Sequence, residues 1–278
     1  MTVDFTKFPF PSLQQPQAAT VTEAITAEPV ASGFVIITLK ATDAEGFVAN
    51  VRALAQALRA KAGSSGLTDI IACRQVGRDE LGGAMPFDQP ICESLLREAA
   101  SRESTRHAAG MVSAIVLGNA VANWVLRLEF KTPELASAAA LAFNGGDAGF
   151  AALTSAASEH TVGAFRNMMR YASVSRDPNV IQFFNLFPSP GKLDVLWPAW
   201  QEALPWFFEV GGILSSFPLL ALDPKQPMLL VNCAHCDSIK TFLIGTLYDP
   251  RFVETLKACY GQRGVTDPMP FFCKIVPV

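Results

Sequence analysis

The chain has 278 residues, of which 50% are hydrophobic and 17% are charged, with a net charge of -3 at pH 7. Its length predicts one or two domains, and its apolar composition excludes a mainly disordered chain. The weakly acidic balance argues against nucleic acid as a partner. We also expect no membrane span, because no run of about 20 apolar residues is free of charge, Pro or Gly.

Residues 1–32 are rich in Gln, Ala and Thr, and they lack the charged start and apolar stretch of a signal peptide. We therefore expect an N-terminal arm and a cytoplasmic protein. Six cysteines are scattered along the chain, which favours reduced thiols over structural disulfides.

In chain order, residues 33–40 form a β-branched run typical of a strand, and an amphipathic helix follows through Phe47 and Leu58. A second strand is predicted over residues 67–73. The different pattern of residues 74–120, with a Gly-rich turn, indicates an insertion. A strand over 122–130, an Ala-rich helix from Pro133 broken at 144–146, and a strand over 164–174 complete this half.

The order then starts again after Asp177-Pro178, a natural turn. The second half is predicted to contain strands over 179–187, 213–222, 228–233 and 269–278, an aromatic helix over 191–210, and a helix over 237–260 with a break at Asp249-Pro250.

Both halves therefore follow the order βαββαβ, which is the ferredoxin-like plan of four antiparallel strands with helices on one face. We expect an α+β protein with a first unit over 33–176, carrying the insertion at about 74–120, and a second unit over 177–278. The strand Val180–Phe187 is apolar on both faces. Each sheet therefore needs a cover, and the sheet of the other unit can provide it within one chain.

With its FFNLF, FFEVGG and LYDPRFVETLKACYGQRGVTD segments, the second unit resembles the dimeric α+β barrel superfamily, and in particular an uncharacterised branch related to antibiotic-biosynthesis monooxygenases. The resemblance implies two fused ferredoxin-like units that form a barrel within one chain. It also implies a cavity in which shape and a few polar groups run the chemistry without a cofactor.

Polar residues on apolar strands are the candidate catalytic groups, because a buried polar group costs free energy unless it has a partner or a task. Asn185 and Asn232 fall on strands that are neighbours in this fold, and we expect them to share a pocket with His235 and Tyr248. We assign catalysis to His235, Asn232 and Tyr248, with His235 as the acid or base because its ordinary pKa is near neutrality.

Substrate-binding residues are expected among the aromatic and polar side chains of the same region, namely Asn185, Trp197, Trp200, Phe183 and Arg127. Trp197 and Trp200 belong to the aromatic helix, whose rings either fill the space on the sheet or line an apolar cavity. Arg127 and Glu129 share one strand face, and they either serve the site or pair with each other.

Two alternatives concern metals and haem. Cys233 and Cys236 flank His235, but a closed zinc site needs four ligands and the chain has no second Cys/His pair, so we predict no metal. Haem-binding relatives of the barrel use a proximal His, for which His160 at an expected helix end or His235 is available.

We therefore expect a cofactor-independent monooxygenase, isomerase or cyclase that acts on a small apolar or aromatic metabolite. A non-catalytic ligand-binding or interaction protein is the alternative, and a haem-binding barrel is the third option. A homodimer of the fused chain is left open.

Overall fold

The computed structural model describes residues 33–41, 44–76, 122–168, 176–189, 193–209, 213–236 and 269–278. The expected N-terminal arm, nearly all of the expected insertion, and the expected helix over 237–260 lie outside the described residues. None of the described helices is long and apolar enough to cross a membrane.

The first unit contains four strands and four described helices. They are β1 (Gly33–Ala41), α1 (Ala44–Ala60), α2 (Ala62–Ser65), β2 (Leu67–Gln75), β3 (Trp124–Phe130), α6 (Pro133–Asn144), α7 (Ala148–Ser155) and β4 (Ala157–Asn167). Local signals start these helices: the Thr132 side chain accepts a hydrogen bond from the Leu135 amide ahead of α6, and Asp147 accepts one from the Gly149 amide at α7. Pro133 fits the first turn of α6, where no amide donor is needed.

The second unit contains β5 (Ile181–Pro188), α8 (Leu193–Glu209), β6 (Ile213–Ala221), β7 (Met228–Cys236) and β8 (Met269–Val276). Helix α8 continues through Pro198 and Pro205, although both residues remove an amide donor. Both prolines are exposed, so the carbonyls that lose a partner can bond water.

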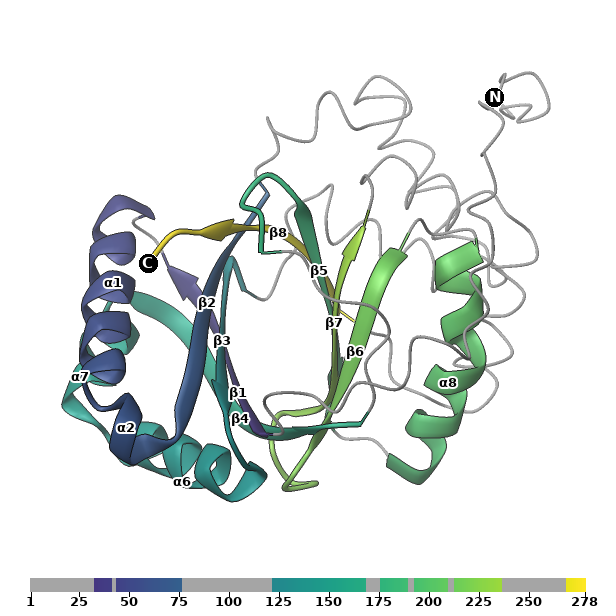
Figure 1. The fold of residues 1–278 in the computed structure, drawn as a ribbon, viewed down its shortest axis with the longest axis horizontal. Helices are drawn as coiled ribbons and strands as arrows, with labels where there is room; N and C mark the ends of the chain where they lie inside the picture. The colour runs from purple at the N-terminus through teal and green to yellow at the C-terminus, as the bar shows by residue number, and fades with distance from the viewer. Residues whose placement is uncertain are drawn as a thin grey trace.

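The eight strands form a closed barrel in the order β1-β3-β2-β8-β5-β7-β6-β4 (Figure 1). Each unit contributes one four-stranded antiparallel sheet with its first and third strands in the middle, as the ferredoxin-like plan requires. Two seams join the sheets: Ala72–Gln75 pair with Cys273–Val276 of β8, and Phe165–Asn167 pair with Leu219–Ala221 of β6. Closure leaves neither sheet with a free edge at these strands.

Side chains alternate between the inside of the barrel and its outer face, because successive residues of a strand point to opposite sides. One core cluster joins both units inside the barrel and includes Phe34, Val125, Phe184, Phe217 and Val231. A second cluster packs the outer face of the first sheet against α1, α6 and α7. Helix α8 lies outside the second sheet, beside β6 (Figure 1).

Two strands extend past one end of the range that their sequence pattern predicts. Strand β4 starts at Ala157, so His160 lies in a strand and not at a helix end. Residues Ser158, Glu159 and His160 are exposed and carry no apolar pattern, but Leu39 and Lys40 of β1 pair with His160 and Glu159. Likewise, β7 continues to Cys236, which pairs with Ile181 and Ile213. In both strands the partner's backbone, not the local pattern, sets the end.

Candidate functional site

A pair of asparagines lies at the centre of the second sheet. Asn185 of β5 is directly opposite Asn232 of β7 in the strand register. Asn185 is 1% exposed and Asn232 is 6% exposed. Since Phe184 and Val231 belong to the interior cluster, their neighbours Asn185 and Asn232 face the outer side of the sheet. The expected adjacency of the two asparagines is confirmed.

The two carboxamides differ in their hydrogen bonds. Asn232 accepts through its Oδ1 a hydrogen bond of 2.5 Å from the hydroxyl of Ser216, which is on the neighbouring strand β6. Both side-chain atoms of Asn185 are buried, and they have no hydrogen-bond partner among the residues that the structure describes. A buried amide without a partner costs free energy, so this position is a candidate ligand contact.

Aromatic side chains lie on the same outer side of the second sheet as this polar pair. Phe183 and Phe272 pack there with ring centroids 4.9 Å apart. On α8, Trp200 is 1% exposed, and Trp197 stacks on it at 5.4 Å with an interplanar angle of 9°. The described and buried side chains of β5, β6, β7 and α8 on this side are apolar or aromatic except for Asn185, Asn232 and Ser216. The layer therefore offers amide hydrogen bonds within aromatic surroundings.

His235 does not join this layer. Its Nδ1 is 2.6 Å from the hydroxyl of Ser215, whereas Asn232 bonds the next residue, Ser216. Ser215 and Ser216 are consecutive residues of β6 and point to opposite faces, and His235 lies on the inner side with Cys233. The expected pocket with Asn232 and His235 together is thus not formed. Burial lowers the pKa of the half-buried His235 imidazole.

Arg127 also lies inside the barrel, away from the asparagines. Its guanidinium is 2.9 Å from the carboxylate of Glu129 and lies over the ring of Phe217, 4.8 Å from the centroid. Burial by itself would lower the pKa of Arg127, but the Glu129 carboxylate and the nearby Cys233 and Cys73 outweigh it, so the pKa is raised. Arg127 and Glu129 pair with each other, which was one of the two alternatives for them.

The thiols of Cys73 and Cys233 lie close to this ion pair, and the Cys273 thiol lies beside them. All three are buried. Burial raises the pKa of Cys233 to about 12, and the positive charge of Arg127 only partly opposes this effect. Burial also raises the pKa of Cys273. The Cys233 and Cys273 thiols are therefore poor nucleophiles and poor metal ligands, because both roles need the thiolate.

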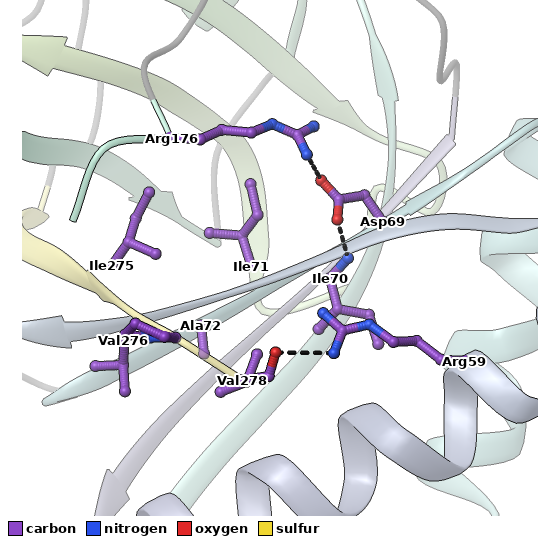
Figure 2. A pocket seen from close by; sticks show the side chains of 10 residues that line it. Arg59, Asp69, Ile70, Ile71, Ala72, Arg176, Ile275, Val276 and Val278 are labelled. Carbon is purple, nitrogen blue, oxygen red and sulfur yellow. Dashed lines mark hydrogen bonds and ion pairs between the residues drawn. The ribbon is translucent and has the colours of Figure 1, made fainter.

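A small pocket of about 170 Å³ opens where β2 and β8 separate (Figure 2). Its walls include Ile71, Ile275 and Val276, and its rim carries the ion pair between Arg176 and Asp69. Asp69 also accepts a hydrogen bond of 2.8 Å from the Ile70 amide, which β8 does not reach. This volume is below the usual range for small-molecule sites, about 300–1,000 Å³.

The metal and haem alternatives find little support in the described part of the chain. It contains no group of three or more His, Cys, Asp or Glu side chains that could hold a metal ion. His160 is exposed, with its ring edge-on to Phe150 at 5.9 Å. His235 lies beside a packed apolar cluster, and neither histidine lines the pocket at the β2–β8 seam.

The structure brings five of the eight expected site residues to the outer side of the second sheet: Asn185, Asn232, Phe183, Trp197 and Trp200. His235 and Arg127 are on the inner side, and Tyr248 lies outside the described residues. Sequence reasoning missed Ser215 and Ser216. The signal was present, since these are two adjacent polar residues in the otherwise apolar strand ILSSFPLLA.

The chain resembles several solved structures at low sequence identity. A crystal structure of an anthrone oxidase-like protein has a TM-score of 0.58 and 11% identity, and the match covers 90% of this chain and 93% of that one. A proposed monooxygenase from Fusobacterium nucleatum matches with a TM-score of 0.48, 6% identity and coverage of 90% and 94%. A dye-decolorizing peroxidase from Bacteroides thetaiotaomicron matches with a TM-score of 0.37, 12% identity and coverage of 90% and 94%.

These structures have the dimeric α+β barrel fold, and this chain has it too, with both ferredoxin-like units in one polypeptide. The anthrone oxidase-like protein supports this assignment, because its TM-score of 0.58 is reached over 90% of this chain and 93% of that one. No protein-family model matches the sequence. No curated protein matches it either.

Proposed function

We propose that this protein is an oxidative enzyme that binds a small aromatic metabolite on the outer side of the second sheet and oxidises it with molecular oxygen, without a bound cofactor. The observation that carries the proposal is the buried, unpartnered carboxamide of Asn185 opposite Asn232 in an aromatic layer. The name of the anthrone oxidase-like structure supports an oxidation over an isomerisation or cyclisation.

A substrate of this class has a ring carbonyl and an acidic C–H bond, as in anthrone. In the overall reaction the ring CH₂ loses two hydrogens, one oxygen atom of O₂ becomes the new ring carbonyl, and the other leaves as water. Loss of the C–H proton places negative charge on the existing ring oxygen. Hydrogen bonds from Asn185 and Asn232 to that oxygen would stabilise the charge as it develops.

The carboxamides cannot themselves accept the C–H proton at neutral pH. The base is not among the buried described side chains of the layer, and His235 faces the other side of the sheet. We therefore assign Asn185 and Asn232 to substrate binding and charge stabilisation, and we assign His235 no role in the reaction.

The proposal is tested with anthrone in air-saturated buffer, by measuring oxygen uptake and the yield of anthraquinone. The wild-type protein should accelerate both over a buffer blank. Asn185→Ala should lower the rate by about a hundredfold to a thousandfold, as is usual when a donor to a developing oxyanion is lost. His235→Asn should retain the rate, and dialysis against a chelator should not change it.

If the wild-type protein does not exceed the blank but anthraquinone quenches its Trp fluorescence in an Asn185-dependent manner, the catalytic proposal is wrong and the ligand-binding alternative holds. If neither turnover nor binding is detected, the layer is not a ligand site for this class of compound.

A further inference from the structure

Ser216 is the one hydroxyl that contacts the asparagine pair within the described residues. It is 1% exposed and donates the 2.5 Å hydrogen bond to Oδ1 of Asn232. We infer that Ser216 is a positioning residue, which fixes the Asn232 carboxamide so that its Nδ2 group is presented beside Asn185. This inference rests on the proposed function of the layer.

The two amides can offer hydrogen-bond donors to a ligand. A carboxamide offers two N–H donors on nitrogen and an acceptor on oxygen. Because Ser216 occupies Oδ1 of Asn232, the end of that side chain available to a ligand is the donor end. Asn185 has its donor end available as well, since none of its side-chain atoms is bonded among the described residues.

Rotation of a carboxamide determines which of its two ends a ligand meets. The terminal torsion of an Asn side chain is broad and nearly two-fold, so an unconstrained carboxamide can present either its oxygen or its nitrogen. The bond from Ser216 removes this ambiguity at Asn232. Directly opposed residues of antiparallel strands have Cβ atoms about 4.5–5.5 Å apart, which allows both Nδ2 groups to reach one ligand atom.

These two amides therefore favour a ligand with a hydrogen-bond acceptor. Asn232 presents an N–H donor and the unconstrained Asn185 carboxamide can direct its own N–H to the same oxygen. The layer should therefore select an aromatic compound with a ring carbonyl over one of the same shape without it. Replacing Ser216 should weaken this selection, because the Asn232 oxygen would then face the ligand carbonyl in part of the population.

The experiment measures dissociation constants by Trp fluorescence quenching for two water-soluble probes, anthraquinone-2-sulfonate and anthracene-2-sulfonate, which differ in the two ring carbonyls. The wild-type protein should bind the anthraquinone at least about tenfold more tightly, the ratio that one or two hydrogen bonds supply. Ser216→Ala should reduce this ratio by about fivefold or more. Ser216→Thr, which keeps the hydroxyl, should restore it.

Ser215→Ala is the matched control, since Ser215 is equally buried on the same strand but bonds His235 on the opposite face. It should leave the ratio unchanged. The ratio separates positioning from general loosening, because a loosened layer weakens both probes in parallel. Should Ser216→Ala fail to fold by circular dichroism, Ser216→Cys replaces it, as a thiol of similar size is a poor donor.

The outcomes also separate the two proposals. If the wild-type protein prefers the anthraquinone and Asn185→Ala abolishes the preference while Ser216→Ala keeps it, Ser216 is not a positioning residue and the site proposal stands. If the wild-type protein shows no preference between the probes or binds neither, the site proposal fails and the role of Ser216 fails with it.

Discussion

The guanidinium of Arg127 lies inside the barrel, 4% exposed, with Glu129 as its partner at 2.9 Å. A buried ion pair is costly to desolvate, and removing one partner leaves a buried charge without compensation. We expect Glu129→Gln to lower the free energy of unfolding by about 3–5 kcal/mol, measured by urea denaturation. The double variant Arg127→Met/Glu129→Leu should lose less than Glu129→Gln alone, and an equal or greater loss would contradict this account.

His235 provides a pH prediction. Its pKa is lowered in the folded protein, so the unfolded chain binds the proton more strongly. The stability that the neutral imidazole contributes is therefore present above the unfolded pKa, near 6.5, and is lost as the pH falls through the lower folded pKa. Urea midpoints at pH 8 and pH 5 should differ less in His235→Asn than in the wild-type protein. Equal pH dependence in the two proteins would show that His235 does not contribute.

At the residue scale, the sequence predicted which residues are adjacent better than it predicted the side of the sheet on which each residue lies. The proximity of Asn185 and Asn232, and the pairing of Arg127 with Glu129, follow from strand order and from a spacing of two. That Asn232 and His235 face opposite sides follows from their odd spacing only if the strand continues to His235. The local pattern predicted that this strand ends at Cys233, but pairing with its neighbouring strand extends β7 to Cys236.

At the scale of the elements, the start of β1 depends on close approach of two backbones. A Cβ atom at Gly33 would lie 2.2 Å from the carbonyl oxygen of Thr132 and 2.8 Å from Cα of Pro133, at the turn into α6. Backbone atoms cannot move aside as the end of a side chain can. We expect Gly33→Ala to lower the free energy of unfolding by about 1–3 kcal/mol or more, as overpacking does.

Gly63→Ala is the control for this prediction, since a Cβ at Gly63 meets nothing within 4 Å and the residue is helical. It should leave the stability unchanged or raise it by less than about 1 kcal/mol, the helix preference of Ala over Gly. Thermal unfolding of both variants checks the difference. Equal stability of the two variants would mean that β1 can move away from the turn.

The elements whose pattern was periodic and capped were well predicted, such as β1 and the break between α6 and α7. The element that deviated most, β4, starts with the exposed residues Ser158, Glu159 and His160. Their strand conformation comes from pairing with β1, which single-sequence periodicity does not contain.

For the whole molecule, the interior cluster draws residues from both units, for instance Phe34 with Phe217 at 5.7 Å. Neither sheet covers its inner face without the other, so we expect one cooperative unfolding transition. In Trp124→Phe, the remaining Trp residues all belong to the second unit, because the other three of the four are Trp197, Trp200 and Trp206. Its fluorescence midpoint should coincide with the circular dichroism midpoint, and separated midpoints would mean that the units unfold independently.

The sequence by itself determined the order of elements, the need for a second sheet as a cover, and the aromatic and polar residues from which a site can be built. These are consequences of periodicity, composition and strand order, which are local or repeat along the chain. The tertiary structure decided the strand ends, the two short seams that close the barrel, and the side of the sheet on which each candidate residue lies. The physical reason is that hydrogen-bond pairing between distant strands sets the register, and register determines which side chains meet.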